Sequence, residues 1–367
     1  MAQWNRVPLI DYIELIGGGT PKTTVPEYWN GNIPWLSVKD FNNDKRYVYS
    51  TEKHISQSGF ENSPTKMLHK DDIIISARGT VGEIAMIPFD MAFNQSCYGI
   101  RASRGIDKPF LYYLLKNCIS QLKRMTHGSV FDTITRDTFA NIEVDIPDAE
   151  TQKRISSVLA DIDNKIEVND AINDNLQQQA QAIYSSMFID NPDPAWSHGH
   201  LSDLITVKYG KDHKKLADGI YPVYGSGGIM RYVERPLYNK ESVLIPRKGT
   251  LNNVMYVNQP FWSVDTMFYT EMKLPNVAKF VYHFVKAKDL ASMNAGSAVP
   301  SMTTDILNAM EVVIPSASAL EEFESLVAPM YEAMEANDVQ SKALSQMRDT
   351  LLPKLMSGEI DVSAVQL

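Results

Sequence analysis

The chain has 367 residues, of which 44% are hydrophobic and 22% charged, and its formal net charge is −9. This composition is typical of a globular protein long enough for two hydrophobic cores. The sequence contains no uncharged apolar run of about 18 residues and no apolar N-terminal stretch, so we expect neither membrane insertion nor secretion and place the chain in the cytoplasm. Cys97 and Cys118 have no CxxC partner, which excludes a disulfide framework and favours two reduced thiols.

The first half of the chain predicts a mixed α/β domain followed by a long helix. An apolar run at 72–76 indicates a buried strand, and 110–116 indicates a short helix. Beyond residue 150, apolar residues recur at alternating steps of four and three, which is coiled-coil spacing. This seam consists of Ile155, Leu159, Ile162, Ile166, Asn169, Asn173, Leu176, Ala180, Ile183 and Met187.

The second half follows the same order. A short helix is expected at 277–285, and Ser357-Gly358 should end a long C-terminal helix. We expect Pro329 to kink or restart that helix. Short strands separated by glycine turns are expected at 242–245, 253–257 and 267–270.

The two halves are copies of one unit. Residues 128–188 align with 296–356 at one constant shift, and Arg78-Gly-Thr80 resembles Lys248-Gly-Thr250 at a slightly larger shift. The constant shift predicts a second seam equivalent to the first. It consists of Phe323, Val327, Met330, Met334, Asn337, Ser341, Leu344, Arg348, Leu351 and Leu355.

These features predict an α/β (α+β) fold. Two similar mixed α/β domains would be joined by two long helices, which pack as an antiparallel coiled coil about a pseudo-twofold axis. Asn169 and Asn337 share one seam position, where a buried pair would fix the helix register at a cost in stability; alternatively, both lie at the edge of the seam in water. The predicted segments are a first domain at 1–147, its spacer helix at 148–190, a second domain at 191–315, and a second spacer helix with a C-terminal tail at 316–367.

The net negative charge lies in the helical segments. Residues 1–150 carry 16 basic and 18 acidic side chains and residues 191–315 carry 13 and 11, whereas 151–190 carry 3 and 6 and 316–367 carry 3 and 9. The two larger stretches are therefore free to present a basic surface to a polyanion.

The sequence shows no motif of a catalytic site. Asn191-Pro-Asp-Pro194 only approaches the (D/N)PP(F/Y) loop of an adenine methyltransferase and is better interpreted as a linker. No GxxxxGK[ST] loop, HExxH pair or GxSxG elbow occurs, and His198, His200 and His213 lack metal-ligand spacing. We therefore expect no catalytic residue, metal or cofactor in this chain.

Basic residues beside Gly, Ser and Thr occur in both domains. Arg247-Lys248-Gly-Thr250 directly follows a predicted strand, and Arg78-Gly-Thr80 resembles it. Such residues hold phosphates, and Arg, Asn and Gln read base edges, but scattered lysines are more often solvated surface side chains. Further basic residues are Lys22, Lys39, Lys45, Arg46, Lys123, Arg124, Lys208, Lys211, Lys214, Lys215, Arg231 and Arg235.

Four segments closely resemble the specificity subunit of type I restriction-modification enzymes. They are Gly17-Gly-Gly-Thr-Pro21, Tyr28-Trp-Asn-Gly-Asn-Ile-Pro-Trp-Leu-Ser37, Asn94-Gln95-Ser96 and the ending Leu351-Leu-Pro-Lys-Leu-Met-Ser-Gly-Glu-Ile360. The resemblance implies a non-catalytic reader of double-stranded DNA, with two target recognition domains that each read one half of a split, asymmetric sequence. The helices would act as a ruler and dock two modification (methyltransferase) subunits, with or without restriction (motor and nuclease) subunits. S-adenosylmethionine, ATP and Mg would belong to those partners.

Candidate DNA contacts combine this resemblance with side-chain chemistry and loop position. The two copies differ where Gln152 aligns with Leu320, and 35–37 has no clear counterpart in the second domain. The candidates in the first domain are Lys22, Trp35, Ser37, Lys39, Arg78, Thr80, Asn94 and Ser129, and in the second Lys208, Lys211, Tyr224, Ser226, Arg247, Lys248, Thr250 and Ser297.

Two other classes of protein remain as alternatives. A structural coiled-coil adaptor would explain the helices but not two large divergent domains, and it should show no salt-dependent affinity for DNA. A self-contained nuclease or methyltransferase would need a carboxylate or cofactor motif that the sequence does not show.

Overall fold

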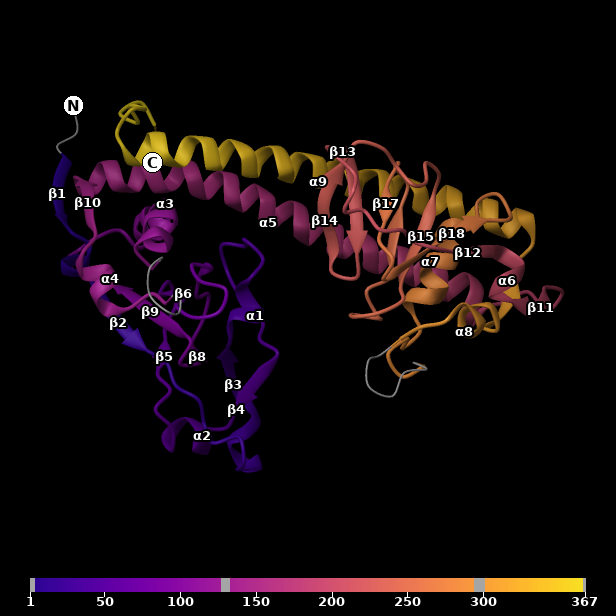
Figure 1. The fold of residues 1–367 in the computed structure, drawn as a ribbon, viewed down its shortest axis with the longest axis horizontal. Helices are drawn as coiled ribbons and strands as arrows, with labels where there is room; N and C mark the ends of the chain where they lie inside the picture. Colours follow the sequence, from indigo (N-terminus) through magenta and orange to yellow (C-terminus); the bar gives the residue numbers. More distant parts are fainter. Residues whose placement is uncertain (1–3, 127–132, 294–300, 366–367) are drawn as a thin grey trace. The chain divides into compact units, whose positions relative to one another are not determined.

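The computed structural model describes residues 4–126, 133–293 and 301–365 (Figure 1). The chain forms two compact units: unit 1 comprises Met1–Ala171 with Asn337–Leu367, and unit 2 comprises Ile172–Ala336. Two long helices, α5 (Ala149–Ser185) and α9 (Ala317–Met356), each contribute to both units. No helix in the described ranges is long and apolar enough to cross a membrane.

Unit 1 contains three sheets. One pairs β1 with β10, a second has the order β2-β9-β6-β7, and a third has the order β4-β3-β8-β5, in which β3 and β8 run parallel. The strands are β1 (Trp4–Pro8), β2 (Ile13–Gly17), β3 (Trp29–Leu36), β4 (Lys53–Ile55), β5 (Met67–Leu68), β6 (Ile73–Ser76), β7 (Ile84–Met86), β8 (Met91–Phe93), β9 (Cys97–Ala102) and β10 (Glu143–Pro147). The helices of the domain are η1 (Leu9–Tyr12), η2 (Pro26–Tyr28), α1 (Val38–Phe41), α2 (Gln57–Glu61), α3 (Lys108–Thr126) and α4 (Arg136–Ala140).

Strand β6 shows why an apolar run forms the centre of this domain. Successive residues of a strand face opposite sides of the sheet. Ile73 and Ile75 pack into the core that contains α3 and the long helices, whereas Ile74 packs into a second cluster with Leu36 and Phe93. Because both faces are covered, all positions of the strand are apolar or buried.

Unit 2 has the same arrangement. Its sheets have the orders β11-β19, β12-β18-β15-β16 and β14-β13-β17, and β13 and β17 run parallel. The strands are β11 (Ser197–His200), β12 (Ile205–Tyr209), β13 (Asp218–Gly225), β14 (Gly228–Val233), β15 (Ser242–Pro246), β16 (Met255–Val257), β17 (Trp262–Ser263), β18 (Met267–Met272) and β19 (Glu311–Ile314). The helices are η3 (Ser186–Asp190), α6 (Leu201–Leu204), α7 (Ala278–Lys286) and α8 (Thr304–Asn308).

The repeat found in the sequence is confirmed in the element boundaries. Helix α4, strand β10 and helix α5 precede α8, β19 and α9 by the same constant shift that aligns the sequence, and β9 and α3 precede β18 and α7 by the slightly larger one. Further upstream the equivalence changes, because β2 and β9 begin much farther apart along the chain than β12 and β18. The first domain is therefore longer between these strands, which is why the sequence alignment weakens there.

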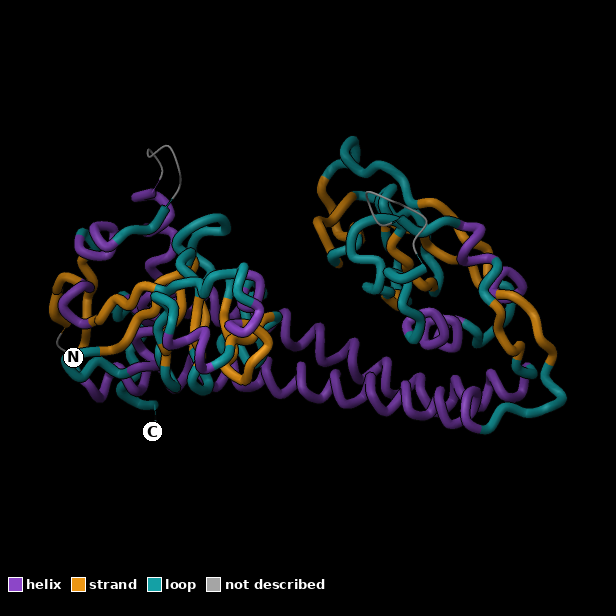
Figure 2. Tube along the Cα trace, turned by 90° about the horizontal axis from the view of Figure 1, so that it is seen from below, coloured by secondary structure: helices purple, strands orange, loops and turns teal. Residues whose placement is uncertain are grey.

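Helices α5 and α9 lie side by side and run antiparallel within each unit (Figure 2). In unit 1, Ile155 of α5 shares a core with Leu355 of α9. In unit 2, the rings of Tyr184 and Phe323 are 6.2 Å apart. Helix α9 does not restart at Pro329, because it continues through this residue. Gly358 follows the end of α9 with φ +72°, as predicted.

The buried position of Asn169 agrees with a polar register contact in the seam. The side chain is fully buried, and its Nδ2 donates to Gln340 Oε1 (2.9 Å), to Ser341 Oγ (3.1 Å) and to the main-chain oxygen of Asn337 (3.4 Å). The interpretation that both asparagines lie in water is therefore wrong for Asn169. Asn337 is half-buried and contributes its carbonyl group to the contact.

Candidate nucleic-acid interface

The loops of unit 1 that carry most of the predicted contacts meet at one end of two sheets. Register pairs place Gly17 opposite Tyr98, Ser76 opposite Cys97, and Leu36 opposite Phe93. The ends of β2, β3, β6 and β8 and the start of β9 therefore lie together. The loops that follow these strands form one surface, which we call the strand-end surface.

Main-chain hydrogen bonds hold this surface together. The amide of Gly19 donates to Phe93 O (3.0 Å), and the amides of Ala77 and Arg78 both donate to Ser96 O (2.8 and 3.2 Å). A Cβ at Gly18 would lie 2.0 Å from Asn94 O, so only glycine allows the two loops to approach this closely. This contact explains the glycine at position 18.

Unit 2 builds the same surface with the same bonds. The amide of Lys211 donates to Ser263 O (2.8 Å), and the amides of Arg247 and Lys248 both donate to Thr266 O (2.8 and 3.2 Å). A Cβ at Gly210 would lie 2.0 Å from the main-chain oxygen of Val264. The backbone of the strand-end surface is therefore duplicated, although most of its side chains differ.

Trp35 has a structural role rather than the predicted role in DNA contact. Its ring is 6% exposed, and its Nε1 donates to Gly19 O (3.1 Å). In unit 2, Trp262 donates from β17 to the equivalent carbonyl of Lys211 (2.8 Å). The counterpart of Trp35 in unit 2 is therefore Trp262. It lies on β17, which runs parallel to the strand equivalent to β3, so an alignment of residues 35–37 could not find it.

The other candidate DNA contacts in unit 1 are either exposed or bonded to other residues of the unit. Lys22, Arg78 and Thr80 are exposed in loops of the strand-end surface. Ser37 caps α1 by bonding to the carboxylate of Asp40 (2.9 Å from Oγ). The remaining candidates also have partners within the unit: Asn94 Oδ1 accepts from the amide of Ser96 (3.0 Å), and exposed Lys39 lies 3.8 Å from the carboxylate of Glu52.

The candidates in unit 2 divide in the same way. Lys211, Lys248 and Thr250 are exposed, and Arg247 and Ser226 are half-buried at the same surface. Tyr224, another predicted contact, is only 8% exposed and packs against Phe261, so its ring belongs to the core of the domain. Lys208 lies within β12, where it pairs with Glu271 (3.5 Å). The positions of Ser129 and Ser297 are outside the described residues.

Sequence reasoning missed Tyr209 at this surface. It is the last residue of β12 and is 52% exposed. The guanidinium carbon of Arg247 lies 5.4 Å from the centre of its ring. The only available signal was a tyrosine directly before Gly210-Lys211.

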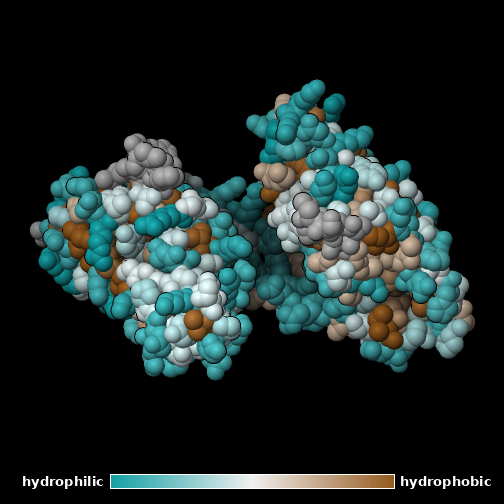
Figure 3. Space-filling view, turned by 60° about the horizontal axis from the view of Figure 1, so that its bottom comes forward, coloured by the Kyte–Doolittle hydropathy of each residue, from teal (hydrophilic) through white to brown (hydrophobic). Residues whose placement is uncertain are grey.

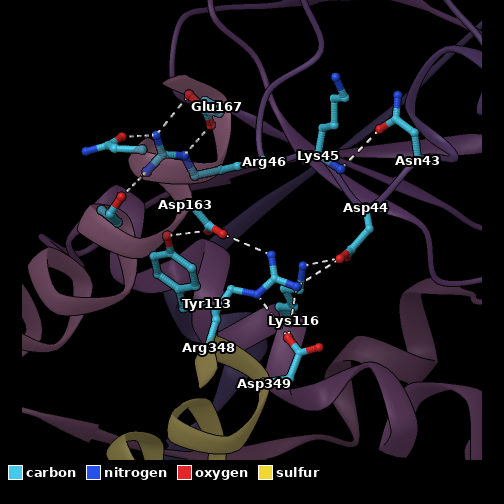
Figure 4. A network of polar contacts seen from close by, with 12 residues as sticks. Asn43, Asp44, Lys45, Arg46, Tyr113, Lys116, Asp163, Glu167, Arg348 and Asp349 are labelled. Carbon is cyan, nitrogen blue, oxygen red and sulfur yellow. Dashed lines mark hydrogen bonds and ion pairs between the residues drawn. The ribbon is translucent and has the colours of Figure 1, made fainter. Parts of the chain in front are cut away.

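Lys45 and Arg46 serve inside unit 1 instead of adding to a basic surface. Lys45 pairs with Asp170 (2.8 Å), and buried Arg46 pairs with Glu167 (3.1 Å), both on α5. Burial disfavours the charge of Arg46, but Tyr113 and Glu167 outweigh this and raise its pKa. This loop therefore anchors the domain to the helix (Figure 4).

Arg348 of α9 is the centre of the same anchor. Its Nη1 donates to Asp163 (2.9 Å) and its Nη2 to Asp44 (2.8 Å), while the hydroxyl of Tyr113 on α3 donates to Asp163 (2.7 Å; Figure 4). Burial alone would raise the pKa of Asp44, but Lys116 and Arg348 lower it. The anchor thus joins the domain to both long helices within unit 1.

The residues of unit 2 that replace Tyr113, Asp163 and Arg348 are uncharged at neutral pH. His283 replaces Tyr113 on the equivalent helix, and it lies 2.8 Å from Gln181 Oε1 and 3.0 Å from the hydroxyl of Tyr331. Because the amide oxygen only accepts, Nδ1 carries the proton and Nε2 accepts from the tyrosine. Burial lowers the pKa of His283 to about 4.

Both units have a mainly hydrophilic surface on the face shown in Figure 3. Figure 3 shows one face of each unit, on which hydrophilic residues (teal) surround smaller hydrophobic areas (brown).

Among the described residues, no group of three or more His, Cys, Asp or Glu side chains could hold a metal ion. Both thiols are buried, and burial raises the pKa of Cys97 to about 12 and that of Cys118 to about 11.

Comparison with known families gives this architecture a context. The sequence model described as "Type I restriction modification DNA specificity domain" matches residues 1–178 and 195–323. The chain belongs to this family. The two matches cover both strand-end surfaces, and the first also covers most of α5.

Individual members of the family are similar to this chain over most of its length. The type I restriction enzyme MjaIX specificity subunit of Methanocaldococcus jannaschii is 26% identical over 98% of this chain and 94% of its own length. The EcoprrI specificity subunit of Escherichia coli is 23% identical over 89% of each chain. The crystal structure of a type I restriction-modification S subunit from M. genitalium matches with a TM-score of 0.57 at 17% identity, covering 96% of both chains, and so shares the fold.

Proposed function

We propose that this specificity subunit reads a split, asymmetric sequence in double-stranded DNA, with one half-site contacted by each strand-end surface. The observation that carries the proposal is the duplication of that surface. The same main-chain bonds hold the loops in both units, while the side chains at the surface differ: exposed Arg78 in unit 1, and half-buried Arg247 with exposed Lys248 in unit 2. A constant frame with different side chains is what two readers of different sequences need.

The long helices supply the second part of the proposal, the docking of two modification subunits. Residues outside the heptad seam are exposed although apolar, including Val168 and Val339 in unit 1 and Ile172 and Leu326 in unit 2. Exposed apolar side chains on a helix favour contact with a partner helix or sheet. Adenine methylation with S-adenosylmethionine, and cleavage with ATP and Mg, would then take place in the partner subunits, so this chain itself has no catalytic role.

The deciding experiment is co-expression with the methyltransferase subunit encoded beside this chain. The purified complex should methylate adenines in a split motif, which single-molecule sequencing of the host genome would reveal. Exchange of 1–147 should change one half of the motif, and exchange of 191–315 the other. Failure to co-purify together with the absence of a motif would instead favour a structural adaptor.

A substitution in unit 2 tests the DNA contact directly. Arg247→Ala should weaken binding to the cognate duplex by about 1 to 3 kcal/mol if Arg247 reads a guanine. Arg235→Ala is the matched control, because exposed Arg235 follows β14 at the end opposite the strand-end surface. Equal affinities of the two variants would remove Arg247 from the interface.

A further inference from the structure

The strand-end surface of unit 2 contains an arginine whose orientation is fixed from two sides. The guanidinium of Arg247 lies over the exposed ring of Tyr209, with 5.4 Å between its carbon and the ring centre. Its Nη1 also donates to the main-chain oxygen of Asp265 (3.2 Å). Within the described parts of the chain, Arg247 forms no ion pair with a carboxylate, so its charge and remaining N–H donors are available to a ligand.

The ring of Tyr209 is itself held in place. Tyr209 pairs with Phe268 across β12 and β18, and the two rings meet edge to face with their centres 5.0 Å apart. Phe268 is fully buried. A core residue thus positions the tyrosine, and the tyrosine positions the arginine, which reduces the conformational freedom that an exposed arginine would lose on binding.

Unit 1 cannot form this pair. The position of Tyr209 at the end of β12 corresponds to Gly17 at the end of β2, which lies opposite Tyr98 as Tyr209 lies opposite Phe268. The position of Arg247 corresponds to Ala77, since the amides of both residues donate to equivalent carbonyl oxygens. The pair is therefore a property of the second reader alone.

We propose that Tyr209 is a positioning residue for Arg247 and that the two give unit 2 a requirement for a guanine in its half-site. This inference rests on the proposed DNA-reading function and names one of its determinants. A planar guanidinium held in a fixed orientation can bond to O6 and N7 of guanine together, which is the most common specific contact of arginine in the major groove. The ring stabilises the guanidinium in that orientation through a cation–π contact.

The test uses the complex of the full chain with its methyltransferase subunit. Binding is measured to duplexes in which each base pair of both half-sites is replaced in turn. Arg247→Lys should reduce discrimination at one guanine of the unit 2 half-site by about tenfold or more, because lysine cannot form the bidentate contact. Tyr209→Leu should reduce discrimination at the same position by roughly 2- to 10-fold, because it removes the ring face.

Tyr209→Phe is the conservative control, since it keeps the ring and should keep the preference for guanine. The half-site read by unit 1 should be unchanged in all three variants, which also reports that the complex is folded. Identical base preferences of Tyr209→Leu and Tyr209→Phe would overturn the positioning role. A unit 2 half-site without guanine would overturn the whole inference while leaving the proposed function intact, whereas wild-type complex without salt-dependent, sequence-selective binding would overturn both.

Discussion

Arg348→Met should destabilise unit 1 by about 3 to 5 kcal/mol, because it leaves the carboxylate of Asp163 buried without a cation. The two side chains are 3% and 4% exposed, and their charged atoms lie 2.9 Å apart. With an effective dielectric constant of about 20, two charges at this separation attract by about 6 kcal/mol, and desolvation of both groups offsets most of this. Removal of one partner leaves only the desolvation cost.

Arg6→Met provides the matched control. Arg6 and Glu143 are also close, at 2.7 Å, but their side chains are 68% and 58% exposed. Exposed pairs of this kind contribute about 0 to 1 kcal/mol because water already stabilises both charges. The two variants lose the same type of interaction and differ mainly in burial.

Hydrogen exchange of the full chain measures the two units separately, which is needed because two units are not expected to unfold as one. Slowly exchanging amides of β6 report on unit 1, and those of β15 report on unit 2. Arg348→Met should lower the opening free energy at β6 and leave β15 nearly unchanged. A loss at β6 no greater than that of Arg6→Met would refute the argument.

A combined variant tests whether the loss comes from an unpaired charge. Arg348→Met, Asp163→Leu and Tyr113→Phe together remove the pair and the hydroxyl that donates to it. Replacement of a whole buried pair by apolar residues is often neutral or stabilising, so most of the loss at β6 should be recovered. If the triple variant is less stable than Arg348→Met alone, the cavity or packing, and not the charge, dominates.

Three further predictions concern His283, the two seam asparagines and two loop glycines. Burial lowers the pKa of His283 to about 4, so between about pH 6.5 and 4 the unfolded chain binds a proton that the folded chain does not. Unit 2 should therefore lose about 2 to 3 kcal/mol as the pH falls through this range, whereas His283→Gln should not; urea unfolding followed by hydrogen exchange of β15 at about pH 7 and about pH 4.5 measures this. Asn169→Leu with Asn337→Leu should raise the melting temperature and loosen register, because Asn169 Oδ1 is buried without a donor among the described residues; a lower melting temperature would contradict this. Gly249→Ala should weaken DNA binding more than Gly79→Ala. Both glycines have a positive φ, +85° and +79°, but only at Gly249 would the new Cβ lie 2.6 Å from a hydroxyl, that of Ser226. Equal affinities of the two variants for DNA would contradict a role of that contact.

The repeat and the helices could be predicted from the sequence because their signals are periodic. The constant shift between 128–188 and 296–356 predicted equivalent segments, and α5 and α9 begin at positions related by that same shift. The heptad spacing predicted that the helices pair, and Ile155 and Leu355 do share a core. The upstream equivalence of Gly18 and Gly210 was hidden because the first domain is longer there, although the two glycines make the same close contact.

The exposure of individual side chains could not be predicted, because it depends on partners far away in the sequence. Trp35 was expected at DNA from its segment, but the carbonyl of Gly19 draws its indole into the domain. Arg46 was expected on a basic surface, but Glu167 on α5 binds it 121 residues later in the chain. No local pattern distinguishes an arginine that pairs internally from one that is exposed, such as Arg78.

The anchors show which parts of the chain can vary independently. In unit 1, Tyr113 donates to Asp163 of α5, whereas in unit 2 His283 accepts from Tyr331 of α9. Each domain is therefore matched to its own stretch of helix, while the strand-end surfaces depend on main-chain bonds that tolerate changes of side chain. It follows that loops of the strand-end surface can be exchanged between relatives without loss of the fold, and that an exchange of a whole domain should carry the helix residues of its anchor. A histidine placed at 113 by such an exchange would face the carboxylate of Asp163, which favours the protonated ring. Its unit 1 should therefore gain stability as the pH falls, the reverse of the dependence expected for unit 2.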